Sequence, residues 1–410
     1  MDAMVMDVLK LLVVFAIIIL VMWYRQPLRI AIVAAMVGAV VLYRLPLTTA
    51  GRALWLGAIG KDTIQSLLVF YTITFLQRMM EKRRNLSNSQ VALNGIFNNR
   101  RINASLAPFM LGCLPAASTV LICGPIVRES VGDYLNTEEK AAITSYFRHI
   151  SESFLPTYTT IFIAISLTNG RVTVSQFLIA MLPMVVALFL VGYVVYLRRI
   201  PKDTGMIPDQ LKRYYWILLA KSIWAIALAI ALILVFNLPV YIAVLICIVL
   251  NVFVNQFSIK EILPFFRTAF EGKLLLSTAL VMMFKEILGA TGVITELPEF
   301  FSKMPLPEFL IFALIFFIGS TVAGSQAIIV LCMPMAMASL GNANALPLFI
   351  LLMCMNYVAM QISPVHICLT LCAEDYRIPL GRMVRKTMPM VVIFSVVAFG
   401  YYFVLNGLVV

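Results

Sequence analysis

Stretches of about 20 mostly apolar residues recur along the whole chain, and they constrain its fold more than any other feature. A helix needs about 20 such residues to cross the hydrocarbon core of a bilayer. Of the 410 residues, 62% are hydrophobic and 12% are charged, and a typical soluble domain has about twice that share of charged residues. We therefore predict an all-α polytopic membrane protein with short loops and no sizeable soluble domain.

The apolar runs predict about ten transmembrane helices and two re-entrant hairpins. The candidate spans are Val8–Tyr24, Arg29–Tyr43, Thr63–Met80, Ala141–Leu167, Thr173–Leu197, Tyr214–Phe236, Val240–Val254, Leu274–Leu288, Leu348–Cys372 and Met388–Leu405. Two further apolar stretches, about 106–127 and 309–338, have polar or Gly/Pro-interrupted centres, LPAAST (114–119) and GSTVAGSQ (319–326). We expect each of these two stretches to enter and leave the membrane on the same side.

Basic residues are unevenly distributed over the predicted loops. Lys and Arg number 31 against 19 Asp and Glu, which gives a net charge of +12. Most of these basic residues face one side if the segment after Thr63–Met80 is cytoplasmic, so the positive-inside rule predicts external N- and C-termini. In a multi-pass chain such an excess does not indicate nucleic-acid binding. Short loops fit a prokaryotic cytoplasmic (inner) membrane, and the seven cysteines, which form no CxxC, are interpreted as packing residues.

The two halves of the chain share the same order of parts. Pro125 and Pro334 lie 209 residues apart in the two hairpins, and Pro156 and Pro364 lie 208 apart in the following spans. Each half has five spans and one hairpin, and an odd number of spans inverts the second copy. We therefore predict inverted repeats, which are typical of secondary transporters, over residues 1–200 and 214–410, joined by a cytoplasmic linker at 201–213.

Proline interrupts one candidate span in each half, about 141–167 and about 348–372. Pro156 and Pro364 remove backbone donors there, and hydroxyl and amide side chains cluster around the freed carbonyls. The predicted substrate-binding residues at these breaks and at the hairpin tips are Ser118, Thr119, Ser151, Ser153, Thr157, Ser320, Thr321, Ser325, Gln326, Gln361, Ser363 and His366. The alternative is that these hydroxyls only bond the carbonyl one turn back.

Ionisable groups inside spans are costly and therefore candidates for function. Glu152 follows Arg148 by one helical turn, so it either binds a coupling cation or proton or forms a local ion pair. The predicted ion-coupling set is Glu152, Ser118, Thr119 and Ser363. The two histidines, His149 and His366, lie beside the two breaks and titrate near neutral pH or serve only as hydrogen-bonding groups.

The predicted pocket has many donors and few carboxylates, which favours a small anion as substrate. The chain has no GxxxxGK[ST] motif for ATP and no HExxH or GxSxG motif, so we expect no enzyme activity and no ATP-driven transport. No organic cofactor is predicted, and the cysteines suggest no zinc site. Sodium stays open as a coupling ion, because oxygen ligands bind hard cations without a full carboxylate cage.

This arrangement resembles the ion transporter superfamily, secondary carriers for citrate, dicarboxylates, gluconate and related anions. Within it the chain looks most like an uncharacterised prokaryotic branch of unknown function, through GCLPAASTVLICGPIV (112–127) and QISPVHICLTLCAEDYRIPLG (361–381). The resemblance implies a homodimer in the lipid membrane, in which a scaffold holds a mobile unit and carries the site across by an elevator movement. The sodium/dicarboxylate branch has Ser-Asn-Thr at the hairpin tip, and this chain has Ala117-Ser118-Thr119 instead.

The sequence therefore predicts a secondary active transporter of a small, carboxylate-like organic anion, coupled to sodium or protons. Two other functions stay open. A paired re-entrant loop can also form an anion-conducting channel. Glu152 and the histidines could instead do acid/base work in an intramembrane enzyme or lipid-handling protein.

Overall fold

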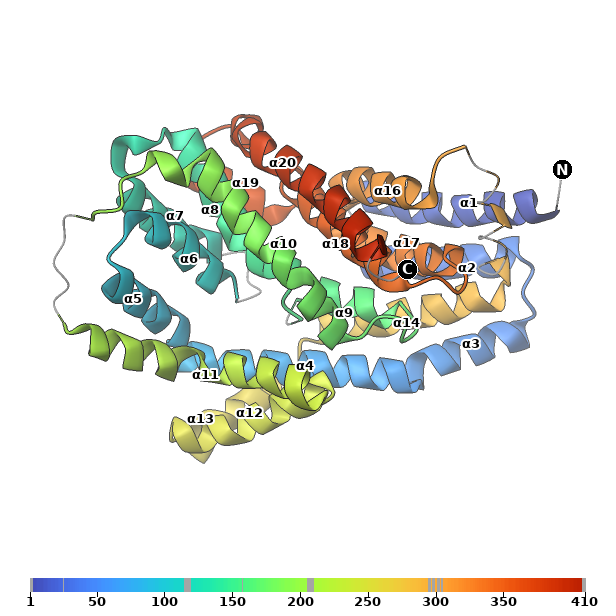
Figure 1. Cartoon of the computed structure of the whole chain (residues 1–410). Helices are drawn as coiled ribbons and strands as arrows, with labels where there is room; N and C mark the ends of the chain where they lie inside the picture. Colours follow the sequence, from blue (N-terminus) through green and yellow to red (C-terminus); the bar gives the residue numbers. More distant parts are fainter. Residues whose placement is uncertain are drawn as a thin grey trace.

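The protein is described here by a computed structural model that covers residues 3–24, 26–113, 119–156, 158–204, 210–293, 296, 299, 300, 303 and 305–407. Within these residues the structure is helical, and its one β-type pairing is an isolated bridge between Asn99 and Asp203. The helices form an elongated molecule whose N-terminus lies at one end (Figure 1).

The described residues form helices along the whole chain. The first half contains α1 (Ala3–Trp23), α2 (Leu28–Leu42), α3 (Leu47–Ile59), α4 (Lys61–Lys82), α5 (Asn85–Phe97), α6 (Arg100–Gly112), α7 (Thr119–Val131), α8 (Thr137–Ile150), α9 (Thr159–Ser166) and α10 (Val174–Val195). The second half contains α11 (Lys212–Phe236), α12 (Val240–Val254), α13 (Ile259–Thr268), α14 (Gly272–Ala290), α16 (Glu308–Ala323), α17 (Ser325–Ser339), α18 (Ala345–Met360), α19 (Ile367–Asp375) and α20 (Leu380–Gly407). Each of the ten candidate spans overlaps one or two of these helices.

Local sequence signals explain many of the helix starts. Capping boxes begin α8, α10 and α13, in which Asn136, Thr173 and Ser258 each pair with a Glu or Gln three residues later. Proline occupies the N-cap position of α2, α3, α12 and α16, where its fixed φ suits the entry into a helix. The helices α3, α5 and α13 lie outside the candidate spans, because they are short and α5 and α13 are less apolar.

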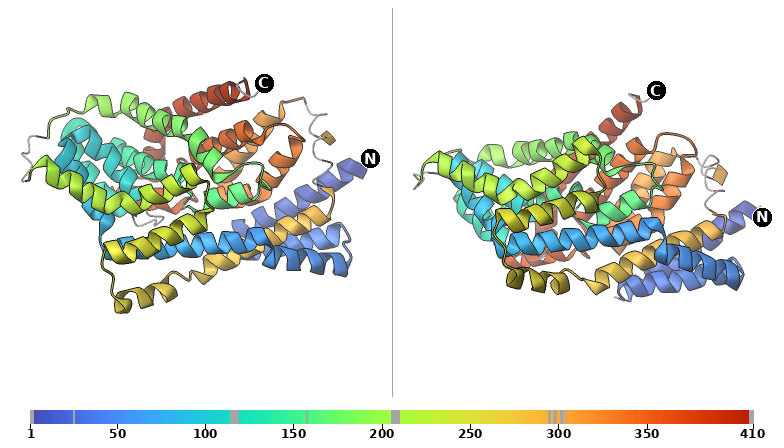
Figure 2. Two further views of the ribbon diagram at one scale, coloured as in Figure 1. Left: turned by 60° about the horizontal axis from the view of Figure 1, so that its bottom comes forward. Right: turned by 90° about the horizontal axis from the view of Figure 1, so that it is seen from below.

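The helices pack as two bundles. We call α1–α5 with α11–α14 the first bundle and α6–α10 with α16–α20 the second bundle, because most helix contacts fall within each group. The main contacts between them are those of α5 with α6 and of α4 with α9. In the left view of Figure 2 most of the blue and yellow helices of the first bundle lie below the teal, green and orange helices of the second. Each bundle thus combines helices from both halves of the chain.

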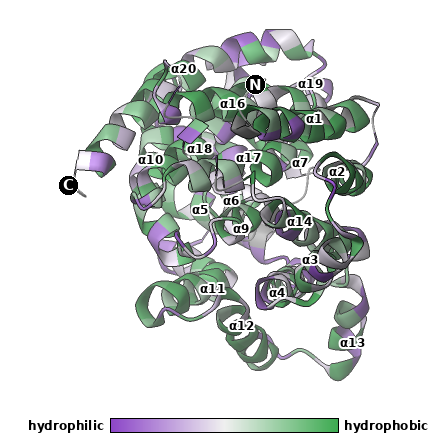
Figure 3. Ribbon diagram, turned by 90° about the vertical axis from the view of Figure 1, so that its right-hand side faces the viewer, coloured by the Kyte–Doolittle hydropathy of each residue, from purple (hydrophilic) through white to green (hydrophobic). Residues whose placement is uncertain are grey.

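Several helices have the composition of membrane helices. Within the described residues α10, α11 and α20 are long and apolar enough to cross a membrane, judged by length and composition, and five other apolar helices are shorter. On α10 the side chains of Ile179, Leu182, Val186 and Leu190 are exposed on the outside of the chain at helical spacing. Most of the ribbon in Figure 3 has the green colour of hydrophobic residues. These helices indicate a multi-pass membrane protein, because an outward apolar stripe suits lipid and not water.

Both predicted hairpins consist of two helices packed against each other, α6 with α7 and α16 with α17. In the first, residues 114–118 of the expected tip lie outside the described residues. In the second, the irregular centre is smaller than the sequence suggests, because α16 continues to Ala323 and α17 begins at Ser325. Gly324 alone makes the turn with a φ of +88°, a left-handed conformation that favours glycine. Ser320 and Thr321 are therefore helical residues.

Candidate functional site

The first helix break separates α8 from α9. A short 3-10 turn, Ser151–Ser153, follows α8, and α9 begins at Thr159 after Pro156. The end of α6 lies directly against this break, because a Cβ on Gly112 would meet the Arg148 carbonyl oxygen at 2.2 Å. The Tyr158 hydroxyl donates a hydrogen bond to the Gly112 carbonyl. A close backbone approach and a side-chain hydrogen bond thus hold the first hairpin against the first break.

The second break separates α18 from α19, and two side-chain hydrogen bonds join it to the second hairpin. Ser363 donates to the Thr321 carbonyl oxygen at 2.7 Å, and Ser320 donates to Asn356 Oδ1 at 2.9 Å. The side chains of Ser320, Asn356 and Ser363 are buried, and that of Thr321 is partly exposed. Because α16 bonds both to α18 and to the break after it, the hairpin and the broken helix form one unit.

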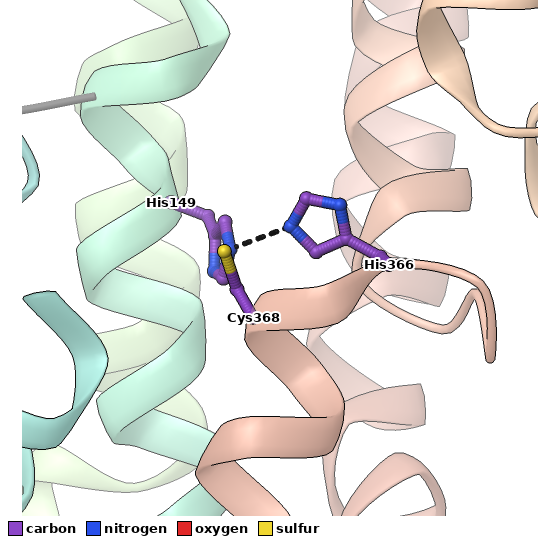
Figure 4. A group of neighbouring side chains, drawn as sticks. All are labelled: His149, His366 and Cys368. Atoms are coloured by element: carbon purple, nitrogen blue, oxygen red, sulfur yellow. Dashed lines mark hydrogen bonds between the residues drawn. The ribbon is translucent and has the colours of Figure 1, made fainter. Parts of the chain in front are cut away.

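The two breaks meet through the two histidines of the chain. His149 Nε2 on α8 lies 2.9 Å from His366 Nε2 at the N-cap of α19 (Figure 4). His149 Nδ1 lies 2.5 Å from the Ser145 carbonyl oxygen, which can only accept, so Nδ1 carries the proton. In a neutral His149 the Nε2 atom is then an acceptor, and His366 Nε2 donates to it. Residues 217 positions apart are therefore in direct contact.

The ion pair that the spacing of Arg148 and Glu152 allows is present beside the histidines. Arg148 Nη1 lies 2.5 Å from Glu152 Oε2, and the Arg148 and Glu152 side chains are 2% and 15% exposed. The same carboxylate oxygen lies 3.9 Å from His149 Nε2. A buried charge without a partner would be strongly destabilising, so this pairing explains how Arg148 can sit inside the second bundle.

A narrow cavity lies between the first break and the second hairpin. Its polar lining comes from Glu152, Ser153, Thr160, Ser325 and Asn356, together with apolar residues of α9 and α18. Thr160 and Ser325 belong to the first turns of α9 and α17, and neither helix has a side-chain cap at its N-terminus. The first N–H groups of both helices therefore lie next to the cavity, where they favour negative charge.

The cavity contains only part of the predicted binding set. Glu152, Ser153 and Ser325 line it. Gln326 follows Ser325 on α17 and is half-buried, and Thr119 begins α7 and is buried. Ser118 and Thr157 lie outside the described residues.

Three of the predicted hydroxyl groups bond locally. Ser151 donates to the Arg148 carbonyl, Ser153 to that of Ile150 and Thr321 to that of Phe317. Three or four residues separate donor and acceptor in each case, as the alternative interpretation of these residues expects. Ser320 and Ser363 instead connect different elements.

Gln361, the C-cap residue of α18, is an exception among the buried polar residues. Its side chain is buried, and neither Oε1 nor Nε2 has a hydrogen-bond partner among the described residues.

The two prolines at the helix breaks have different surroundings. Pro156 lines an apolar cavity against α4, α11 and α12, whereas Pro364 is exposed.

Two residues of this region have no place in the sequence-based set. Asn356 is the only amide in the apolar helix α18, and that isolation is the signal that could have revealed it. Cys368 lies two residues after His366, and its Sγ and the Nε2 or Nδ1 atoms of His149 and His366 fall within 4.8 Å of one another (Figure 4). His366-x-Cys368 was the available signal, but its partner His149 is far away in sequence.

Comparison with curated protein sequences finds no match to this chain. A family model does match, and it covers residues 7–405. Its description is "Protein of unknown function (DUF401)". Because the match spans nearly the whole sequence, the chain belongs to the DUF401 family.

Proposed function

We propose that the protein is a secondary active transporter of a small organic anion, coupled to sodium or protons, and that it works by an elevator-type movement. The cavity between Glu152, Ser153, Thr160, Ser325 and Asn356 is the observation that carries this proposal. It lies where interrupted helices from the two halves of the chain meet. In transporters, substrate sites typically form between the ends of discontinuous helices at the interface of two repeats.

The charges around the cavity favour an anion. Arg148 neutralises Glu152, the one carboxylate in its lining, at 2.5 Å. The first turns of α9 and α17 then contribute the positive ends of two helix dipoles, and the Asn356 amide and the Ser325 hydroxyl offer further hydrogen bonds. A carboxylate would accept these bonds, whereas a cation would meet two positive helix ends.

The two bundles suit the proposed movement. The first bundle would be the scaffold and the second the mobile unit, since the second contains both hairpins and both breaks. Between them, at the α4–α9 contact, lies a crevice of about 390 Å³ that ends at the turn between α11 and α12. A crevice at this place leaves room for one bundle to shift against the other.

In this scheme the cavity would be closed to the substrate. The cavity measures about 10 Å³, which is about the space that a single water molecule needs. A carboxylate would fit only after the α16–α17 turn and the first break had moved apart. Gly324, the one-residue turn, and the 3-10 segment Ser151–Ser153 are the places where such a change is easiest.

The test is uptake into proteoliposomes that contain the purified protein. Labelled mono-, di- and tricarboxylates are supplied with an inward sodium gradient, with an inward proton gradient, or with neither. We expect saturable accumulation of one class of carboxylate above its external concentration, and only under one of the two gradients. Flux that equilibrates without accumulation would identify a channel, and no flux of any carboxylate would contradict the proposal.

Two variants on the same helix locate the site. Ser325→Ala removes a hydroxyl from the cavity lining, and we expect the KM for the transported anion to rise several-fold. Ser339→Ala, at the other end of α17, removes a hydroxyl that donates to the Ala336 carbonyl at 3.1 Å and should leave KM unchanged. Equal effects of the two substitutions would place the substrate elsewhere.

A further inference from the structure

We propose that His149, His366 and Cys368 bind one borderline transition-metal ion of the Zn²⁺ class, which joins α8 to the second helix break. This site needs neither the transported substrate nor the elevator movement. It also differs from the sequence-based interpretation of Cys368 as a packing residue.

The distances fit a tetrahedral ion after a small adjustment. One potential ligand atom from each of the three side chains lies within 4.8 Å of the other two, and the two Nε2 atoms are 2.9 Å apart. Zinc binds imidazole nitrogen at about 2.0–2.1 Å and thiolate sulfur at about 2.3 Å, which sets ligand atoms roughly 3.3–3.7 Å apart. The nitrogens would separate by a few tenths of an ångström. The sulfur would move by no more than about 1–1.5 Å.

His149 is oriented as metal-binding histidines usually are. Its Nδ1–H donates to the Ser145 backbone carbonyl, and its side chain is completely buried. This bond sets the tautomer and leaves the Nε2 lone pair directed at His366 and Cys368 (Figure 4). A backbone carbonyl in this role raises the basicity of the ligand and fixes its ring plane.

The other two ligands come from the beginning of one helix. His366 is the N-cap of α19 and Cys368 is its second residue, so the start of this helix carries both. Ile367 between them is 65% exposed, whereas Cys368 is 5% exposed, so the two neighbours face opposite ways. The arrangement brings an imidazole and a thiol to His149 from neighbouring positions at one helix start.

The surrounding charges accommodate a dication. On binding, the Cys368 thiol would lose its proton to solvent, and the resulting thiolate would cancel one positive charge, with no change of oxidation state. His366 would bind through Nε2 as its Nδ1–H tautomer, with the proton of Nε2 exchanged to Nδ1 through solvent. Glu152 Oε2 lies 3.9 Å from His149 Nε2, so this carboxylate is a neighbour or a fourth ligand of the ion. Arg148 is the nearby cation, and it is paired with that carboxylate. Imidazole with thiolate selects Zn²⁺ and similar ions over Mg²⁺ or Ca²⁺.

The experiment is metal loading of the purified full-length protein in detergent. After removal of metal with a chelator, the protein is titrated with Zn²⁺ and, separately, with Co²⁺, and bound metal is measured after gel filtration. We expect one ion per chain. With Co²⁺ we also expect thiolate-to-cobalt charge-transfer absorption and the visible bands of a tetrahedral site. Less than a tenth of an ion per chain, or Co²⁺ spectra without a thiolate band, would overturn the proposal.

Matched variants identify the ligands. Cys368→Ser should abolish the thiolate band and lower Zn²⁺ affinity at least tenfold, and His366→Gln should weaken binding similarly. Cys372→Ser is the control, because Cys372 lies one turn further along α19 and its Sγ faces the Ala141 carbonyl at 3.5 Å. If the thiolate band disappears in Cys372→Ser or persists in Cys368→Ser, the assignment is wrong. Cys368→Ser is a nearly isosteric change, so this test does not depend on a variant that fails to fold.

Discussion

Arg128 Nη1 of α7 lies 2.7 Å from Asp375 Oδ2 of α19, so an ion pair joins the first hairpin to the helix after the second break. The Arg128 guanidinium also covers the Tyr376 ring at 4.6 Å from its centroid. Gly124 allows this approach, since a Cβ there would meet Asp375 Oδ2 at 2.4 Å. Residues 247 positions apart thus connect the two halves inside the second bundle.

We expect the Arg128–Asp375 pair to contribute about 1 kcal/mol to the free energy of unfolding, because both side chains are partly exposed. The measurement is a double-mutant cycle with Arg128→Gln, Asp375→Asn and the double variant, followed by thermal or denaturant unfolding in detergent. A coupling energy near zero would mean that the contact does not hold α7 to α19.

Two glycines of α3 should respond oppositely to alanine. A Cβ on Gly57 would lie 2.4 Å from Met283 Cα of α14, so Gly57→Ala forces the two helices apart and should cost about 1–3 kcal/mol. Gly51 has nothing within 4 Å, and Gly51→Ala should stabilise α3 by up to about 1 kcal/mol. Melting temperatures of both variants check this, and equal shifts would contradict the close packing of α3 on α14.

Glu139 should contribute far more to the stability of the fold than its neighbour Glu138. Glu139 closes the capping box of α8 and lies 3.0 Å from Arg199 and 3.5 Å from Lys386 with a buried side chain. We expect Glu139→Ala to cost about 1–3 kcal/mol.

The control is Glu138→Ala, because Glu138 only approaches the exposed Arg382 at 3.7 Å. Glu138→Ala should change the free energy of unfolding by no more than about 0.5 kcal/mol. Unfolding of the two variants side by side gives the comparison. Similar losses in both would show that helix propensity, and not the cap and its ion pairs, dominates.

The Glu261 carboxylate should make stability depend on acidity. The hydrogen bond from Arg83 and that from the Ser258 backbone lower the pKa of Glu261 from 4.5 to about 2. Because the unfolded chain binds this proton more readily than the folded chain, the ionised carboxylate stabilises the folded state. Its contribution to the free energy of unfolding is fully present above about pH 4.5 and disappears as the pH falls towards 2.

Melting temperatures of the wild type, Glu261→Gln and Arg83→Gln between pH 2 and 6 check this prediction. The wild type should melt at a higher temperature than both variants near pH 6, and this difference should disappear as the pH falls towards 2. High salt should reduce the difference, because the pair is near the surface. An advantage that grows as the pH falls would contradict the sign of the linkage.

Local patterns in the sequence were enough to locate the long apolar helices and the second-half break, but not the short helices α3, α5 and α13. Ser363-Pro364 in an apolar segment predicts an interruption, and the structure has one between Met360 and Ile367. The short irregular centre at Gly324 was overestimated, because small and hydroxyl residues are compatible with helix when neighbouring helices cover them. Gly319 shows this, since a Cβ there would meet Ile328 of α17 at 2.6 Å.

By itself the sequence determined that the chain is helical and apolar and where proline interrupts the helices, because hydrophobic runs and proline act over a few residues. Only the tertiary structure decided that His149 meets His366 and that Ser320 bonds to Asn356 instead of to its own helix. Contacts of that kind depend on how the helices pack in three dimensions. Local preferences of the sequence do not determine that the first helix break faces the second.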